Sequence, residues 1–288
     1  MADTTQLTSI TADQAYQIDF NFQQVPSALE VDIPPEAAAA MLHLSTAQWQ
    51  AHVASAAIDC VRKAQALLTN ANHRAAIQRL KTLHQAENPV STVMTVGDSI
   101  TTYRYGYAEI LRQMLDLVDP EKPVQFFNHG RSGYTSTHGL EHTFTQYRVQ
   151  RPDWVFLMYG VNDTKRFGHP EKLLVSADEY TANMTAIIDG FLEIGAQLIV
   201  LTPTPVVESI LADNPVFQTW AMRWDNADIG ARAATLRTLT KTRGVPLVDL
   251  FALFGNTPDP ALLLPDGLHP GPAGHDRIIA QVLERVLI

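Results

Sequence analysis

The segment Ser91-Thr-Val-Met-Thr-Val-Gly-Asp-Ser-Ile100 begins as a run rich in β-branched residues and stops abruptly at Gly97-Asp98-Ser99. The run predicts a buried strand over residues 92–96. The Gly-Asp-Ser sequence at its end fits either of two structures: a plain turn, or a hydroxyl nucleophile presented at the carboxyl end of a sheet strand. The rest of the chain has to distinguish between them.

Similar short apolar runs recur downstream, with helical patterns between them. They lie at residues 124–127, 154–159, 198–201 and 246–250. The clearest helix begins with a capping box of Ser176 and Glu179 and ends at Gly195. We expect it to bury Met184, Ile187, Ile188, Phe191 and Leu192. The last helix carries one apolar stripe, formed by Ile279, Val282, Leu283, Val286 and Leu287. Strands that alternate with helices predict an α/β fold, a three-layer αβα sandwich around a parallel sheet of about five strands.

The first 89 residues have a different texture and are predicted to form an N-terminal extension of a domain at 90–288. Residues 1–35 look irregular, with aromatic and apolar side chains that could wrap across a surface. Residues 36–86 lack Gly and Pro and have apolar residues at three- and four-residue steps, which predicts amphipathic helices. Two interpretations remain open: a packing or homodimerisation appendage, and a cover over an active site.

Polar clusters follow the predicted strands at the places that a doubly wound sheet brings to one edge. They are Gly97-Asp98-Ser99, Asn128-His129-Gly130, Gly160-Val161-Asn162-Asp163 and, before the last helix, Asp266-Gly267-Leu268-His269. Each cluster is weak evidence alone, because such short sequences are common in turns. Their order, each directly after a strand or before the last helix, is a much stronger signal.

Together these clusters supply the groups needed for acyl transfer. A serine hydroxyl needs a base, and His269 can activate Ser99 while Asp266 fixes the tautomer of the ring. The N–H groups of Ser99 and Gly130 and the side-chain amide of Asn162 are candidate donors for an oxyanion hole. We expect Asp98 and Asp163 to brace loops.

At these residues the sequence resembles the SGNH, or GDSL-type, hydrolase family, named after a Ser, a Gly, an Asn and a His in four blocks. The matching positions are Ser99 in VGDSI, Gly130 in NHGRSG, Asn162 in YGVND and His269 in DGLHP. The resemblance covers about residues 90–288, with Ile100 in place of the usual Leu. It implies a flavodoxin-like sheet and hydrolysis of carboxylic esters through an acyl-serine, without metal or cofactor. Acetyl-type esters, including those of carbohydrates, are the substrates we expect.

Parts of the sequence also fit other functions. His138-Gly-Leu-Glu-His142 matches the H-x-x-E-H zinc pattern of some metallopeptidases, although Gly139 weakens a helix there and no third ligand is evident. A non-catalytic binding module on the same fold is a further alternative. Within acyl chemistry, a lipid-directed esterase, lysophospholipase, thioesterase or acyltransferase remains open.

Candidate substrate contacts lie around the predicted site. Arg131 could meet an anionic group, and Tyr134 and Val161 could line the acyl pocket. Residues 206–229 form a long connection that contains Trp220 and Trp224, so this segment is either a lid or an inserted helix packed on the body.

Composition argues against a polyanionic or membrane partner, and the family resemblance implies a small-molecule ester as the expected partner. The chain of 288 residues has a net charge of −9 and no cluster of basic residues, which argues against nucleic acid. Its apolar runs are too short for membrane insertion, and its first residues do not resemble a signal peptide. With Cys60 as the single cysteine, no internal disulfide can form, and we expect a cytoplasmic protein.

Overall fold

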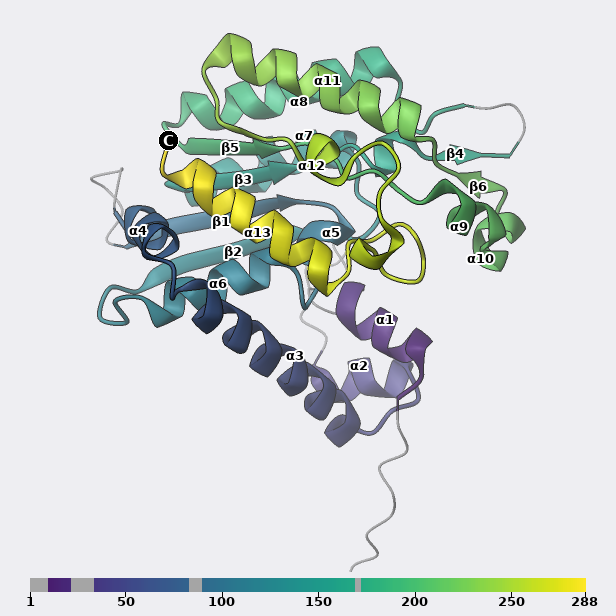
Figure 1. The fold of residues 1–288 in the computed structure, drawn as a ribbon, viewed down its shortest axis with the longest axis horizontal. Helices are drawn as coiled ribbons and strands as arrows, with labels where there is room; N and C mark the ends of the chain where they lie inside the picture. Colours follow the sequence, from purple (N-terminus) through teal and green to yellow (C-terminus); the bar gives the residue numbers. More distant parts are fainter. Residues whose placement is uncertain (1–9, 22–33, 83–89, 169–171) are drawn as a thin grey trace, which may run out of the picture.

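The computed structural model describes residues 10–21, 34–82, 90–168 and 172–288. Five parallel strands form the central sheet in the order β2-β1-β3-β5-β7 (Figure 1). They are β1 (Ser91–Gly97), β2 (Val124–Gly130), β3 (Trp154–Met158), β5 (Gln197–Leu201) and β7 (Leu247–Val248). Counted along the chain this is the 2-1-3-4-5 order of flavodoxin-like folds. The predicted α/β fold is confirmed.

Helices cover both faces of the sheet (Figure 1). In one hydrophobic core, α6 (Tyr107–Leu117) and α13 (Pro272–Val286) pack against one face of the sheet. Helix α4 (Ala71–Leu80), which precedes β1 in the chain, belongs to the same core. The other core packs α8 (Ala177–Glu193) against the opposite face, where α7 (Ser136–His142) and α11 (Asn226–Arg243) also lie. Short helical segments complete these layers: η1 (Thr143–Tyr147), η2 (Arg148–Gln150), η3 (Asn162–Thr164) and η4 (Pro260–Leu262).

Local sequence signals explain where α8 begins and ends. The Ser176 hydroxyl accepts a hydrogen bond from the Glu179 N–H at 3.2 Å, and Gly195 follows the helix with a φ of +81°, a conformation that glycine adopts easily. The predicted buried face is present except for Leu192, which is 37% exposed. That residue lies one position beyond Phe191, where the helix surface already turns towards solvent.

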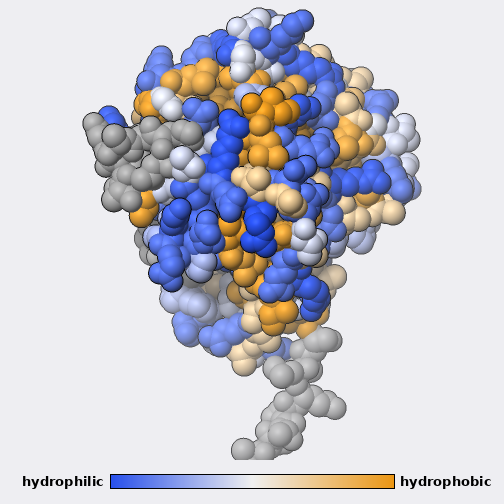
Figure 2. Space-filling model, turned by 60° about the vertical axis from the view of Figure 1, so that its left-hand side comes forward, coloured by the Kyte–Doolittle hydropathy of each residue, from blue (hydrophilic) through white to orange (hydrophobic). Residues whose placement is uncertain are grey.

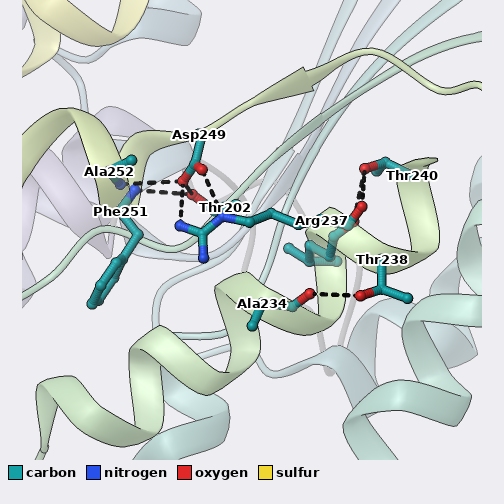
Figure 3. Close-up of polar contacts among 9 residues, drawn as sticks. Thr202, Ala234, Arg237, Thr238, Thr240, Asp249, Phe251 and Ala252 are labelled. Atoms are coloured by element: carbon teal, nitrogen blue, oxygen red, sulfur yellow. Dashed lines mark hydrogen bonds and ion pairs between the residues drawn. The ribbon is translucent and has the colours of Figure 1, made fainter.

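Strand β7 is shorter than the run at 246–250 predicts, because Asp249 ends it and caps α12 (Leu250–Phe254). Its carboxylate accepts hydrogen bonds from the Ala252 N–H at 3.1 Å and the Thr202 hydroxyl at 3.3 Å, and it pairs with Arg237 at 2.6 Å (Figure 3). Burial raises the pKa of Asp249, but the hydrogen bonds from Arg237 and from the Ala252 N–H lower it by more. The pKa of Asp249 therefore lies below its usual value. This network fixes the edge of the sheet to α11.

The N-terminal region corrects one prediction. Residues 12–20 are not irregular but form α1 (Ala12–Phe20), which starts with a capping box between Thr11 and Gln14. Downstream, the predicted helical stretch is divided into α2 (Pro35–Met41), α3 (Thr46–Leu67) and α4. Helices α1 and α2 lie beside α3, on the side of the sheet where the strands end (Figure 1). Homodimerisation through these helices stays a prediction.

Residues 206–229 contain two short helices and a strand rather than a single inserted helix. They are α9 (Glu208–Asp213), α10 (Pro215–Thr219) and β6 (Met222–Arg223), which pairs with β4 (Arg166–Phe167) in a small antiparallel sheet. The Val207 N–H donates to the Gly267 carbonyl at 2.8 Å. The segment therefore packs on the loop that carries the predicted base, and whether it acts as a lid stays a prediction.

The surface on the side where the strands begin shows apolar patches separated by hydrophilic residues (Figure 2). Among the described residues, no helix combines the length and the apolar character needed to cross a bilayer.

Candidate active site

The serine of the opening segment lies where β1 becomes the short helix α5 (Ser99–Thr102). Asp98 caps this helix, with its Oδ1 accepting from the Ile100 N–H at 3.0 Å. Ser99 is 7% exposed, and its N–H has no acceptor among the described residues. The turn therefore presents both a hydroxyl and an open backbone donor at the carboxyl end of the strand.

The predicted base lies on the loop before α13. The Leu264 N–H donates to the His269 carbonyl at 2.7 Å and closes the loop. Asp266 Oδ1 accepts from the N–H groups of Leu268 at 2.9 Å and His269 at 3.0 Å. These bonds hold the carboxylate against the ring that it has to orient.

A continuous chain of hydrogen bonds links the three predicted triad residues. Asp266 Oδ2 lies 2.6 Å from His269 Nδ1, and His269 Nε2 lies 2.8 Å from Ser99 Oγ. Burial raises the pKa of Asp266, but hydrogen bonds from His269 and two backbone N–H groups lower it by more. The net pKa is therefore below the usual value of an aspartate. An ionised carboxylate only accepts, so Nδ1 carries the proton and Nε2 of a neutral ring accepts from the serine hydroxyl. This is the arrangement that a general base requires.

Gly130 lies at the end of β2, against the start of α5. A Cβ at this position would come within 2.4 Å of the Thr102 backbone nitrogen, so only glycine lets the two backbones approach. Its N–H donates to Asn128 Oδ1 at 2.9 Å. The single N–H of Gly130 is thus already bonded within the protein, unlike that of Ser99. Sequence reasoning placed Asn128 in this polar cluster but assigned it no role as the acceptor for the Gly130 N–H.

Asn162 opens η3, directly beyond the end of β3, and is buried. One N–H of its side-chain amide donates to the Tyr134 carbonyl at 3.0 Å, which fixes the amide and leaves its second N–H as a donor. Asp163 braces the neighbouring loop by accepting from the Ser136 N–H at 3.0 Å and the Ser136 hydroxyl at 2.5 Å. Burial raises the pKa of Asp163 to about 6.

The H-x-x-E-H motif takes part in a stack of rings. The Tyr134 ring stacks on His138 with centroids 4.6 Å apart and on His142 at 5.5 Å. His138 Nδ1 also bonds to the Thr135 hydroxyl at 2.9 Å, at the start of α7. Among the described residues, no three His, Cys, Asp or Glu side chains are grouped so that they could hold a metal ion. In this structure the motif supports Tyr134, whose carbonyl holds Asn162.

The remaining predicted substrate contacts occupy different settings. Arg131 is half-buried beside Gly130, and Val161 is buried in the core next to Asn162. Trp224 is also buried and packs edge-on against Phe217 at 5.1 Å. Trp220, by contrast, is 61% exposed at the end of α10. Contact of these residues with a substrate stays a prediction.

Sequence reasoning missed two aromatic residues from α1. The Phe20 ring centroid lies 4.5 Å from that of His269, and the Tyr16 centroid lies 5.9 Å from it. Their spacing of four residues after a capping box predicts one helix face, but nothing in the sequence indicates what that face contacts.

A flavodoxin-like sheet with Ser, His and Asp hydrogen-bonded in series at the carboxyl ends of its strands defines a serine-hydrolase type of site. Residues 95–277 match the GDSL-like Lipase/Acylhydrolase family, and the chain belongs to that family. The protein is a carboxylic ester hydrolase.

Individual relatives are more distant. The chain is 23% identical over 200 residues to a human isoamyl acetate-hydrolyzing esterase 1 homolog, covering 66% of this chain and 79% of the relative. It is 27% identical over 177 residues to an acetylxylan esterase of Geobacillus stearothermophilus, covering 59% and 75%. The crystal structure of an acetylxylan esterase from the same organism has a TM-score of 0.54 at 23% identity, covering 69% of this chain and 94% of that one. This structural likeness supports the fold.

Proposed function

We propose that the protein hydrolyses short-acyl esters, of the acetyl type, through an acyl-serine at Ser99. The observation that carries the proposal is the unbroken hydrogen-bond series from Asp266 through His269 to Ser99. In the first half-reaction His269 Nε2 takes the hydroxyl proton while Ser99 Oγ forms a bond to the ester carbonyl carbon. The imidazolium then gives this proton to the departing alcohol oxygen as the old C–O bond breaks.

In the second half-reaction a water molecule replaces the alcohol. His269 takes one proton from the water, the hydroxide oxygen bonds to the acyl carbon, and the proton returns to Ser99 Oγ as the acid leaves. The Asp266 carboxylate stabilises the imidazolium that forms in each step.

Negative charge on the carbonyl oxygen requires donors in each half-reaction. The open donors are the Ser99 N–H and the second N–H of Asn162, and each such donor contributes about 3–4 kcal/mol to transition-state stabilisation. Gly130 is a third donor only if its N–H is shared between Asn128 and the substrate oxygen.

Two observations support a small acyl group. The two relatives from different kingdoms both carry names that refer to acetate esters. In this chain, Ser99 and His269 are only 7% and 3% exposed, which leaves little open surface at the nucleophile.

Initial rates on p-nitrophenyl acetate, octanoate and dodecanoate test the proposal. Wild type, Ser99→Ala and a control, Ser132→Ala on an exposed serine of the same sheet edge, are compared with and without a chelator. We expect a preference for acetate, a loss of about 10⁴-fold or more in kcat for Ser99→Ala, and no effect of Ser132→Ala or of the chelator. Equal rates on dodecanoate would contradict the acyl preference. Activity that survives Ser99→Ala would contradict the mechanism.

A further inference from the structure

Helix α1 covers the side of the catalytic imidazole that the triad hydrogen bonds leave open. The two ring nitrogens of His269 are held by Asp266 and Ser99. Phe20 lies against the ring at 4.5 Å with an interplanar angle of 40°, and Tyr16 approaches edge-on at 67°. Phe20 is itself stacked on Tyr103 at 4.6 Å and 13°. The imidazole is therefore held by hydrogen bonds at its edge and by the Phe20 ring, here called the aromatic wall, on its face.

The wall is fixed to the body of the protein by both main-chain and side-chain contacts. The Arg104 N–H donates to the Asp19 carbonyl at 3.2 Å, and the Arg104 guanidinium donates to the Ile18 carbonyl at 3.3 Å. The Asp19 carboxylate lies 2.7 Å from His52 of α3. Ile18 is fully buried in a small core with Trp49. These anchors hold α1 in one position over the site.

The two aromatic residues of α1 differ in their access to solvent. Phe20 is buried between His269 and Tyr103, whereas Tyr16 is 36% exposed. Burial and, to a lesser extent, the charge of Asp266 raise the pKa of Tyr16 to about 12, so its hydroxyl stays protonated at neutral pH. Tyr16 therefore presents a neutral aromatic surface with one hydroxyl donor at the rim of the site.

We propose that α1 is part of the active site, with Phe20 as a positioning residue for His269 and Tyr16 as a contact for the alcohol part of the ester. This inference rests on the proposed function. The departing alcohol oxygen takes its proton from His269 Nε2, so the alcohol has to lie beside the imidazole, where the exposed Tyr16 ring is available. Aromatic faces pack well against rings and C–H groups, which favours cyclic alcohols over methanol.

The role of Phe20 follows from the precision that the reaction needs. Catalytic groups have to be held within about 0.5 Å of their productive geometry, and side chains packed around them supply this restraint. Two hydrogen bonds fix the nitrogen positions but still allow the ring to tilt about the line between them. The Phe20 ring on the imidazole face blocks that tilt.

Kinetics of four variants on two esters test the proposal. Phe20→Ala removes the wall, Phe20→Leu keeps most of its apolar volume, Tyr16→Ala removes the rim contact, and Ile18→Ala weakens α1 packing without touching His269. The esters are methyl acetate and cyclohexyl acetate, which share the acyl group and differ in the alcohol.

We expect Phe20→Ala to lower kcat about tenfold on both esters with little change in KM, and Phe20→Leu to restore most of it. For cyclohexyl acetate, Tyr16→Ala should raise KM several-fold, which corresponds to about 0.5–1.5 kcal/mol of lost ring packing. For methyl acetate, the same variant should leave KM unchanged. Ile18→Ala should lower kcat clearly less than Phe20→Ala does below its melting temperature, because both aromatic residues remain and the contacts with Arg104 and His52 still hold α1. Equal losses in Ile18→Ala and Phe20→Ala, or equal effects of Tyr16→Ala on both esters, would overturn the proposal.

A readout independent of turnover separates this inference from the proposed function. Nuclear magnetic resonance of ¹⁵N-labelled histidine follows the proton between His269 Nδ1 and Asp266. We expect its signal to be sharp in wild type and in Ile18→Ala, and broadened by exchange in Phe20→Ala. An unchanged signal in Phe20→Ala would overturn the positioning role, whether or not an ester is hydrolysed. Loss of hydrolysis in Ser99→Ala tests only the proposed function.

Discussion

The edge of the sheet and helix α1 meet at His269, but they are held in place in different ways. At the sheet edge, the Ser99 turn continues directly from a paired strand, and the buried Asp98 carboxylate caps it. Asn162 follows the next strand of the sheet, and the buried Asp163 braces its loop by accepting from Ser136. Helix α1 has nine residues, too few to be stable alone, and depends on a few contacts with Arg104, His52 and a small core. The predicted triad therefore lies on the sheet edge and its loops, whereas α1 adds to the site from outside the matched family residues.

The largest effect is expected from the sheet edge. Ser99→Ala and His269→Ala should each lower kcat about 10⁴-fold or more, and the double variant should lose little beyond either single one, because the residues act as a unit. Thermal unfolding of each variant checks that the fold is retained. Additive losses would show that the two residues do not act in one step.

The oxyanion donor should come next. Asn162→Ala is expected to lower kcat by about 10²–10³-fold with a small change in KM, since the amide contributes mainly in the transition state. Asn183→Ala is a matched control, because that buried amide donates to Ser136 and not towards Ser99. A similar loss of kcat in both variants would mean that loop bracing, rather than oxyanion binding, explains the effect.

Breaking the anchor of α1 should cost stability more than rate. Asp19→Ala leaves the half-buried Arg104 guanidinium and His52 without their shared carboxylate, which is expected to reduce the free energy of unfolding by about 3 kcal/mol. We expect kcat to fall less than tenfold, because the triad itself is untouched. Urea unfolding and steady-state kinetics measure both quantities, with Asp13→Asn on the exposed side of α1 as a control. A loss of kcat as large as in Ser99→Ala would contradict the division between the two regions.

The smallest effect concerns Asp98, which burial gives a pKa of about 7. The folded state then binds this proton more tightly than the unfolded state, so this carboxyl lowers stability as pH rises from about 4 to about 7. Asp98→Asn keeps the Oδ1 acceptor for the Ile100 N–H but cannot ionise. Its stability advantage over wild type should therefore grow between pH 5 and pH 8, by about 2.5 kcal/mol. A stability difference that is equal at pH 5 and pH 8 would contradict the burial of this charge.

The sheet and its polar edge could be predicted because their signals are local. Each strand is a short apolar run, and Ser99, Gly130 and Asn162 lie at or shortly after the end of one, so the topology places them at the same sheet edge. Strand ends were less predictable, as in β7, where Asp249 leaves the sheet to cap α12.

The contribution of α1 could not be predicted for a physical reason. Its capping box reveals a helix, but its position depends on contacts with Arg104, which lies more than 80 residues away along the chain. The bond between Gly130 and Asn128 likewise depends on the side-chain geometry at the end of β2. Side chains that pack over a site from another part of the chain leave no spacing rule in the sequence.

The most direct test of the central claim, that Ser99 is the nucleophile activated by His269, is covalent trapping. The protein is incubated with an organophosphorus fluoride, which phosphorylates activated serines, and the adduct is located by peptide mass spectrometry. We predict one adduct per chain, on Ser99, formed in step with the loss of esterase activity and absent in His269→Ala. An adduct on another residue, or full activity after Ser99 is modified, would contradict the account.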